Sequence, residues 1–287
     1  MVIKKGDIVG RKSYGSDVLF KVVDIKETTQ EKTAELRGLD IRLIADAPVN
    51  DLLQKNEEDV KYYQKSFHEK CSNCKKNIFK RRQQEFRQSM NRYQRPLHNE
   101  FFEVPGNVLH IDGDKEYLGK CMNSYEELNI KVRGEYVPEA EQYKVVPSLL
   151  RTEPVDILVL TGHDGIIKGK EDFSDLNSYR HSRYFVEAVK AARAVESSKD
   201  ELVVYAGACQ SHYEALLNAG ANFASSPLRI FIHAFDPVFI VEKVAYTSIV
   251  EKLSIQDVIE NTITGTDGVG GVETRGRFRL GYPKSPY

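Results

Sequence analysis

The sequence predicts an α/β protein, in which a mostly parallel sheet flanked by helices follows a small SH3-like β-barrel module and a basic helical linker. Beyond about residue 104, apolar runs alternate with stretches of helical periodicity, an order that implies right-handed βαβ crossovers. The apolar runs ILVL and LVVY do not alternate with polar residues, as expected for strands covered on both faces. We therefore expect three parts, residues 1–50, 51–103 and 104–287.

The first part, residues 1–50, has the pattern of a small β module. The stretches GDIVGRKSYG, VLFKVVDIKE and TAELRGLDIRLIADAP alternate apolar and polar residues and are interrupted by Gly and Asp. Short strands this close together favour a curled, SH3-like barrel. Such a barrel carries no visible chemistry, and we expect it to position or recruit another element.

Residues 51–103 form a basic linker of high helix propensity. Between residues 61 and 95 the chain has eleven Lys or Arg and two Glu, with aromatic residues interleaved. We interpret this linker as an amphipathic pair of helices whose basic face lies in solvent. The alternatives are binding to an acidic protein or to nucleic acid, and a protease-sensitive linker.

The third part alternates strands and helices in a regular order. We expect strands in NVLHIDGD, KVRGEYV, DILVLTG and ELVVYAG, and helices in KEYLGKCMNSYEELNI, PEAEQYKVVPSLLRTEP, SRYFVEAVKAARAVES and SHYEALLNAG. The second helix is interrupted at Pro147, and the fourth is closed by Gly220. The Gly-rich end of the chain is expected to be a flexible tail. Folding back beside the functional site, and self-cleavage at Arg275, Arg277 or Arg279, are the alternatives.

Composition and charge narrow the range of functions. The chain has 287 residues and a formal net charge of −1, so it is not an obvious polyanion binder, and we do not expect nucleic acid as a partner. It has no apolar stretch near the roughly 20 residues that a membrane span needs, and its start lacks the apolar core of a signal peptide. We expect a protein made and used inside the cell, away from the membrane.

The cysteines are expected to be thiols, because a protein used inside the cell meets a reducing environment. Cys71 and Cys74 form a CxxC, which with His68 supplies three of the four ligands that a structural zinc site needs. The chain also lacks an HExxH motif and a nucleotide-binding Gly-rich loop. We therefore expect no metal and no cofactor.

Two apolar runs end in residues that can carry chemistry. DILVLTGHDG places His163 just past one strand, and LVVYAGACQSHY places Cys209 just past the next. The carboxyl ends of parallel strands share one edge of a sheet, and ligands and catalytic groups gather there. If the two strands are neighbours, the imidazole and the thiol meet on one rim. Taken alone, Cys209 would more often be a small buried apolar residue.

A thiol beside an imidazole can act as a nucleophile, because the imidazole accepts its proton. Cys209 is expected to open a helix, CQSHYEALL, whose N-terminus favours the thiolate. Backbone N–H groups at Asp164, Gly165 and Gln210 are the candidates to hold an oxyanion. These features indicate acyl transfer through a thioester. The rivals of His163 for the role of base are His181, His212 and His233.

The arrangement resembles the caspase-like superfamily of cysteine peptidases, which includes caspases, legumains, clostripains and gingipains. In that superfamily His-Gly ends one strand and Ala-Cys ends the next, roughly fifty residues later. LVLTGHDG and VVYAGACQS match this pattern. The resemblance implies a caspase-like sheet in which Cys209 is the nucleophile and His163 is the general base. Many members have Gly directly after the His, where this chain has Asp164. The backbone N–H that the His loop supplies to the oxyanion hole is therefore that of Asp164 or that of Gly165.

Nearly the whole chain resembles one family more closely, the YabG sporulation-specific peptidases. The segments that carry this resemblance are GDIVGRKSYG, VLHIDGD, LTGHDG, YAGACQSHYEALLNAGANFASSP and the Gly-rich end. The resemblance implies a cysteine endopeptidase of the mother-cell cytoplasm that associates with the spore coat. It further implies cleavage of spore coat and cortex-associated proteins after Arg, together with self-processing.

Cleavage after Arg requires a carboxylate in the pocket that receives the arginine. Some Arg-cutting relatives place an acid two residues before the Cys, where this chain has Gly207. We therefore take Asp112 and Asp114, which follow the first strand, and Asp236, which follows RIFIHAF, as the candidates. The ordinary interpretation of Asp112 and Asp114 is that they form a turn and cap a helix.

Two other functions fit parts of the sequence. GACQSH is similar to the Gly-x-Cys-x-Gly-His elbow of glutamine amidotransferases, whose catalytic His follows the Cys, so His233 would be the base of such an amidase. A non-enzymatic scaffold would use the barrel and the basic linker to dock onto coat or nucleic acid. Replacement of His163 tests the amidase, and replacement of Cys209 tests the scaffold.

Overall fold

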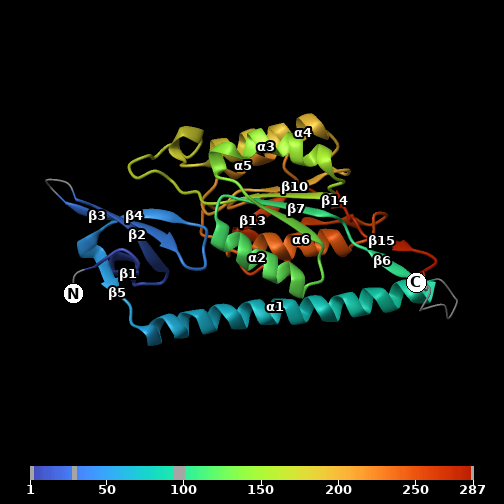
Figure 1. Cartoon of the computed structure of the whole chain (residues 1–287), viewed down its shortest axis with the longest axis horizontal. Coiled ribbons are helices and arrows are strands. Elements are labelled where there is room, and N and C mark those ends of the chain that lie inside the picture. Colours follow the sequence, from blue (N-terminus) through green and yellow to red (C-terminus); the bar gives the residue numbers. More distant parts are fainter. Residues whose placement is uncertain (1–2, 28–30, 93–100, 286–287) are drawn as a thin grey trace.

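The computed structural model describes residues 3–27, 31–92 and 101–285. It places an N-terminal β module at one end of a larger α/β part, with one long helix beneath both (Figure 1). Among these residues no helix combines the length and the apolarity that a membrane crossing requires.

The α/β part is built on a six-stranded sheet of order β13-β11-β10-β9-β7-β8. The strands are β7 (Val108–Asp112), β8 (Val132–Tyr136), β9 (Ile157–Thr161), β10 (Val203–Ala206), β11 (Phe223–Ser225) and β13 (Val269–Gly271). All neighbours pair in parallel except β13, which runs antiparallel to β11. The predicted mostly parallel sheet is therefore confirmed. After β8 the chain crosses back over β7 to form β9, so the strand order reverses between β7 and β9, the position where open α/β sheets bind ligands.

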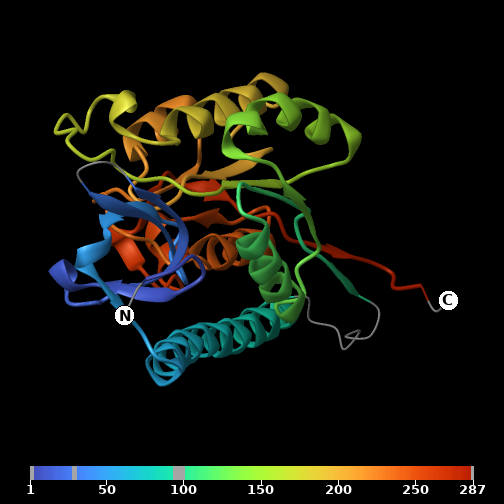
Figure 2. The ribbon, with the colours of Figure 1, turned by 60° about the vertical axis from the view of Figure 1, so that its left-hand side comes forward.

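Helices cover both faces of this sheet (Figures 1 and 2). One layer holds α3 (Glu139–Thr152), α4 (Ser182–Val195) and α5 (Tyr213–Ala219). The other layer holds α2 (Lys115–Glu127), α6 (Asp236–Tyr246) and the short α7 (Ile255–Ile259). Pro147 lies inside α3 without interrupting it, contrary to expectation, because a single lost backbone hydrogen bond is outweighed by the packing of the helix on the sheet.

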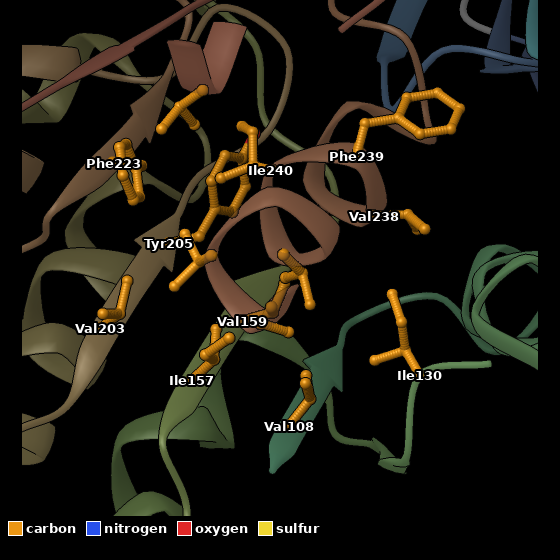
Figure 3. Packing of buried hydrophobic residues seen from close by; sticks show 14 of the residues in the cluster. Val108, Ile130, Ile157, Val159, Val203, Tyr205, Phe223, Val238, Phe239 and Ile240 are labelled. Atoms are coloured by element: carbon orange, nitrogen blue, oxygen red, sulfur yellow. The ribbon is translucent and has the colours of Figure 1, made fainter. Parts of the chain in front are cut away.

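Apolar side chains fill the space between the sheet and α6. Figure 3 shows Tyr205 from β10 beside Ile240 from α6. Nearly every residue of α6 is buried, so this helix is covered on all sides. The sheet is thereby held between two apolar layers, and its carboxyl edge remains free to carry polar groups.

The N-terminal module is a five-stranded antiparallel sheet of order β4-β3-β2-β1-β5. Its strands are β1 (Ile8–Arg11), β2 (Leu19–Glu27), β3 (Lys32–Gly38), β4 (Ile44–Pro48) and β5 (Leu52–Gln54). The last strand carries the module past the predicted boundary at residue 50. An SH3-like closure of these strands stays a prediction. The core of the module includes Cys209 and Ile232 from the α/β part, so the two parts share apolar contacts.

The basic linker forms one helix, α1 (Glu57–Arg92), rather than the expected pair. Residues 93–100 of the predicted linker lie outside the described residues. Cys71 and Ile78 are buried on the side that faces the α/β part. Two of the basic residues, Arg81 and Arg82, bind the fully buried carboxylate of Glu242 in α6 at 2.5 and 2.6 Å. Part of the basic face is therefore used within the molecule.

The Gly-rich C-terminal stretch is folded, so the expectation of a flexible tail is wrong over its strands. β13 joins the central sheet, β14 (Thr274–Arg275) pairs with β12 (Lys252–Leu253), and β15 (Arg279–Gly281) pairs with β6 (Phe102–Val104). Glycine allows the backbones of β13 and β11 to approach each other closely, because a Cβ at Gly271 would lie 2.2 Å from the carbonyl oxygen of Asn222.

Replacement of Glu242 tests how α1 is held. We expect Glu242→Ala to lower the free energy of unfolding by about 3 kcal/mol, because it leaves two partly buried guanidinium groups without their shared partner. The matched control is Glu127→Ala, which removes an exposed partner of Lys75 and should cost less than about 1 kcal/mol. Urea unfolding of the three chains measures both, and equal small losses would contradict the role of Glu242.

Candidate active site

Two neighbouring strands carry the histidine and the cysteine that the sequence singles out. β9 and β10 pair in parallel, and Leu160 stands opposite Ala206. His163 lies three residues after Leu160, and Cys209 lies three residues after Ala206. The shared register therefore brings both residues to the same edge of the sheet.

Cys209 lies in a buried turn rather than at the start of a helix. α5 begins four residues later, at Tyr213, so the expectation that Cys209 opens it is wrong. The left-handed backbone of Gly207 (φ 112°) and of Gln210 (φ 56°) breaks the helical geometry in between. The Ile232 N–H donates to Cys209 Sγ at 3.3 Å. Burial raises the pKa of the Cys209 thiol to about 12, so the thiol is neutral in this arrangement.

The predicted oxyanion donors have internal partners. The Gly165 N–H donates to the side chain of Asp164 at 2.9 Å, and the Gln210 N–H donates to the Ser226 hydroxyl at 3.1 Å. The backbone of Asp164 is paired with Leu43 of the N-terminal module. The assignment of these three residues to an oxyanion hole therefore stays a prediction.

The side chain of Asp164 connects the loop of His163 with the turn of Cys209. One carboxylate oxygen accepts from the Ser182 and Ser211 hydroxyls at 2.5 and 2.8 Å, and the other accepts from the His181 N–H at 2.8 Å. Ser211 belongs to the turn of Cys209, and Ser182 begins α4. Burial raises the pKa of Asp164, against the effect of these donors. Asp164 thus positions the His163 loop against the Cys209 turn.

His163 lies between two carboxylates. Its Nε2 is 3.1 Å from Asp114 Oδ2, and its Nδ1 is 3.6 Å from Glu139 Oε1. Burial alone would lower the pKa of the imidazole, but the two carboxylates outweigh it and the net direction is upward. The site is therefore built to stabilise the protonated form of His163.

Glu139 is a site residue that the sequence reasoning missed. It also accepts the backbone N–H of His163 at 2.8 Å. Two glycines make room for its carboxylate, because a Cβ at Gly113 or Gly162 would lie 2.2 or 2.3 Å from Glu139 Oε1. The signal was present in the pattern: Glu139 follows the predicted strand KVRGEYV, so it ends at the same edge of the sheet as His163.

The three candidate acids have different surroundings. Asp114 caps α2 by accepting the Glu116 and Tyr117 N–H groups, and it also contacts His163. Asp236 is buried and accepts the Ile263 N–H at 2.7 Å, so its carboxylate is committed to a neighbouring loop.

Asp112 is fully buried and binds an arginine. Its Oδ2 accepts from Arg42 Nη1 at 2.6 Å and from the Thr161 hydroxyl at 3.0 Å. Burial alone would raise the pKa of Asp112, but the charge of Arg42 and contact with His110 hold it well below its usual range. Asp112 thus binds a fully buried guanidinium group, whereas Asp114 binds Arg37 at 3.0 Å, whose side chain is partly exposed.

The rival histidines are engaged elsewhere. His233 Nε2 lies 3.8 Å from Cys71 Sγ, and burial lowers the pKa of His233 to about 3. His181 Nδ1 contacts the His163 carbonyl at 2.7 Å, and His212 caps α5. Within the described part of the chain, no group of three or more His, Cys, Asp or Glu side chains is arranged to hold a metal ion.

Replacement of Glu139 tests the electrostatics of His163. We expect Glu139→Gln to lower the pKa of His163, because one of the two carboxylates that raise it loses its charge. An NMR titration of the imidazole measures the shift. Glu141→Gln, an exposed acid paired with Lys144, is the control and should leave the pKa of His163 in place. An unchanged pKa in Glu139→Gln would contradict the account.

The same pair affects stability in a defined pH range. Because folding raises the pKa of His163, its protonated form contributes stability that is complete below the unfolded value near 6.5. That stability is lost as the pH rises through the folded pKa. The contribution of protonated His163 to the free energy of unfolding should be smaller in Glu139→Gln, and urea unfolding of both chains below and above pH 6.5 measures it.

Comparison with known proteins identifies the family of this chain. A family model described as YabG peptidase U57 matches residues 4–283. The chain is 43% identical over 289 residues to the sporulation-specific protease YabG of Bacillus subtilis (strain 168), and the match covers 99% of each chain. The chain therefore belongs to the YabG peptidase U57 family and is a sporulation-associated peptidase.

Proposed function

We propose that this peptidase is a cysteine endopeptidase in which Cys209 is the nucleophile and His163 is the general base and acid. The observation that carries the proposal is the shared register of β9 and β10, which brings both residues to one edge of the sheet. Asp114 and Glu139 then favour the protonated imidazole that the reaction forms. The Cys209 turn and the His163 loop are joined through Asp164.

The proposed reaction has two halves. The Cys209 thiol gives its proton to His163, and the sulfur attacks the carbonyl carbon before the bond to be cut. The C–N bond breaks, and His163 returns the proton to the leaving amine. A water molecule then loses a proton to His163 and attacks the thioester, which releases the new carboxyl end and restores the thiol with that proton.

Cleavage after arginine is part of the proposal, with Asp112 as the acid that receives the guanidinium group. The support is that Asp112, buried beside the catalytic edge, already binds Arg42 at 2.6 Å. The other two candidates are less suited, because Asp114 is shared among His163, Arg37 and the first turn of α2, and Asp236 accepts backbone N–H groups of its neighbouring loop. A bidentate or charge-assisted contact to arginine is the ordinary role of such a carboxylate.

The substrates that we propose are spore coat and cortex-associated proteins, in the mother cell and at the spore coat. The support is the relative's name, which describes a sporulation-specific protease. Self-processing is a further part of the proposal. Of the three arginines in the C-terminal stretch, Arg277 is buried, whereas the side chains of Arg275 and Arg279 are about half exposed (58% and 46%) and are the ones within reach of another copy.

Removal of the proposed catalytic groups tests the mechanism. We expect Cys209→Ala and His163→Ala each to reduce cleavage of a peptide with an internal Arg by about 10³-fold or more. The control is His233→Ala. If the chain were an amidase with His233 as its base, this variant would be inactive, but in the proposed peptidase it should retain activity. A Cys209→Ala chain that cuts like wild type would refute the mechanism.

Replacement of Asp112 tests the specificity. We expect Asp112→Asn to lower kcat/KM at least about 30-fold for a peptide cut after Arg, and much less for the same peptide with Gln in that place. Asp236→Asn is the matched control, because its partners are internal, and it should leave the Arg/Gln ratio unchanged. An unchanged ratio in Asp112→Asn would rule out its role.

A further inference from the structure

A short segment of the N-terminal module crosses the catalytic edge. It is the turn between β3 and β4, residues 38–43. Ile41 pairs with His233 in antiparallel fashion, and Leu43 pairs with Asp164, the residue that follows His163. The Ala234 N–H donates to the Asp40 carbonyl at 3.2 Å. The segment therefore binds on both sides through its backbone, as an added strand or a bound peptide does.

Arg42, at the tip of this turn, enters the pocket of Asp112. Its side chain is fully buried and contacts Asp112 at 2.6 Å and Cys121 Sγ at 3.3 Å. The guanidinium group also lies over the ring of Tyr117, 5.1 Å from its centroid. The backbone of Arg42 lies near the Cys209 thiol and helps to lower its pKa, and the next residue, Leu43, packs in the same apolar cluster as Cys209. The turn thus lies against the proposed nucleophile while Arg42 binds the proposed specificity acid.

We propose that residues 38–43 are a built-in occupant of the substrate cleft and that they hold the peptidase latent, with Arg42 in the place of a substrate arginine. This inference rests on the proposed function of Cys209 and Asp112. The consequence is that a substrate must displace the segment before the thiol is reached, so the enzyme works only when the turn is released.

The alternative is that Arg42 only fastens the module to the sheet. A buried ion pair is a poor fastener, because desolvation of both charges offsets most of their attraction. The pair is also incompletely satisfied: among the residues that the structure describes, Arg42 Nε has no hydrogen-bond acceptor. A pocket shaped to receive arginines from many partners would tolerate such a fit.

Further contacts hold the turn in place without touching Asp112. The Tyr117 hydroxyl donates to the carbonyls of Gly38 and Ile41 at 2.5 and 2.9 Å, and Lys120 Nζ donates to the Leu39 carbonyl at 3.2 Å. The Leu43 N–H closes the turn on the Ile41 carbonyl at 2.9 Å. Because the segment is tethered, its local concentration at the cleft is in the millimolar range, enough to compete with most substrates.

The test compares four variants with wild type on a short fluorogenic peptide that carries Arg before the dye. We expect Arg42→Ala to raise kcat/KM by about tenfold or more, because the pocket becomes free. Tyr117→Phe removes the single hydroxyl donor that the Gly38 and Ile41 carbonyls share, and it should raise kcat/KM about 2- to 10-fold. Arg11→Ala, an arginine paired with Asp51 inside the same module, should match wild type, and Cys209→Ala should be inactive.

Each outcome decides one of the two proposals. If wild type cleaves the peptide as fast as both Arg42→Ala and Tyr117→Phe, while Cys209→Ala is inactive, latency is overturned and the peptidase mechanism is supported. No cleavage by any chain that retains Cys209 would overturn the proposed function and the latency with it. A new amino terminus at Leu43 that requires Cys209 would support the inference, because the turn would then be bound as a substrate. If circular dichroism shows that Arg42→Ala does not fold, Tyr117→Phe decides.

Discussion

The ion pair between Arg42 and Asp112 is the contact on which the relation between the two parts depends. Both side chains are fully buried, so each would be costly without the other. The pair is pH-dependent in a defined way. The pKa of Asp112 is held far below its unfolded value of 3.8, so its contribution to stability is present above that value and is lost as the pH falls through the folded pKa. At neutral pH both groups therefore stay charged, and Arg42 stays opposite Asp112.

The site is assembled almost entirely from residues that follow parallel strands. Asp112 and Asp114 end β7, Glu139 follows β8, His163 follows β9 and Cys209 follows β10. These residues lie far apart in the sequence, but the parallel strands bring them side by side along one edge of the sheet. The proposed nucleophile, the proposed base with its carboxylates and the candidate specificity acid are thus brought together by one geometrical rule.

The same rule explains what the sequence could predict. Continuous apolar runs predict the buried strands, and the ends of these strands predict the edge of the sheet at which Asp112, His163 and Cys209 lie. Glu139 also follows a predicted strand, so the same rule predicts its position at this edge.

What escaped prediction depends on contacts between distant segments. The start of α5 was misplaced, because the backbone of Gly207 and Gln210 is set by packing around the turn. The C-terminal strands follow from pairing partners far away in the chain, and their glycines serve close approach rather than flexibility. Arg42, in a part expected to carry no chemistry, could not be connected to Asp112, 70 residues away, by any local pattern.

The most direct test of the central claim is covalent trapping by a peptide that ends in an arginyl acyloxymethyl ketone. This group reacts with a thiolate held beside a bound arginine. The full chain carrying Arg42→Ala, which lacks the proposed occupant of the arginine pocket, would be incubated with the probe, digested and mapped by mass spectrometry. The account predicts that Cys209 carries the label. A label on Cys71, Cys74 or Cys121, with Cys209 unmodified, would contradict it.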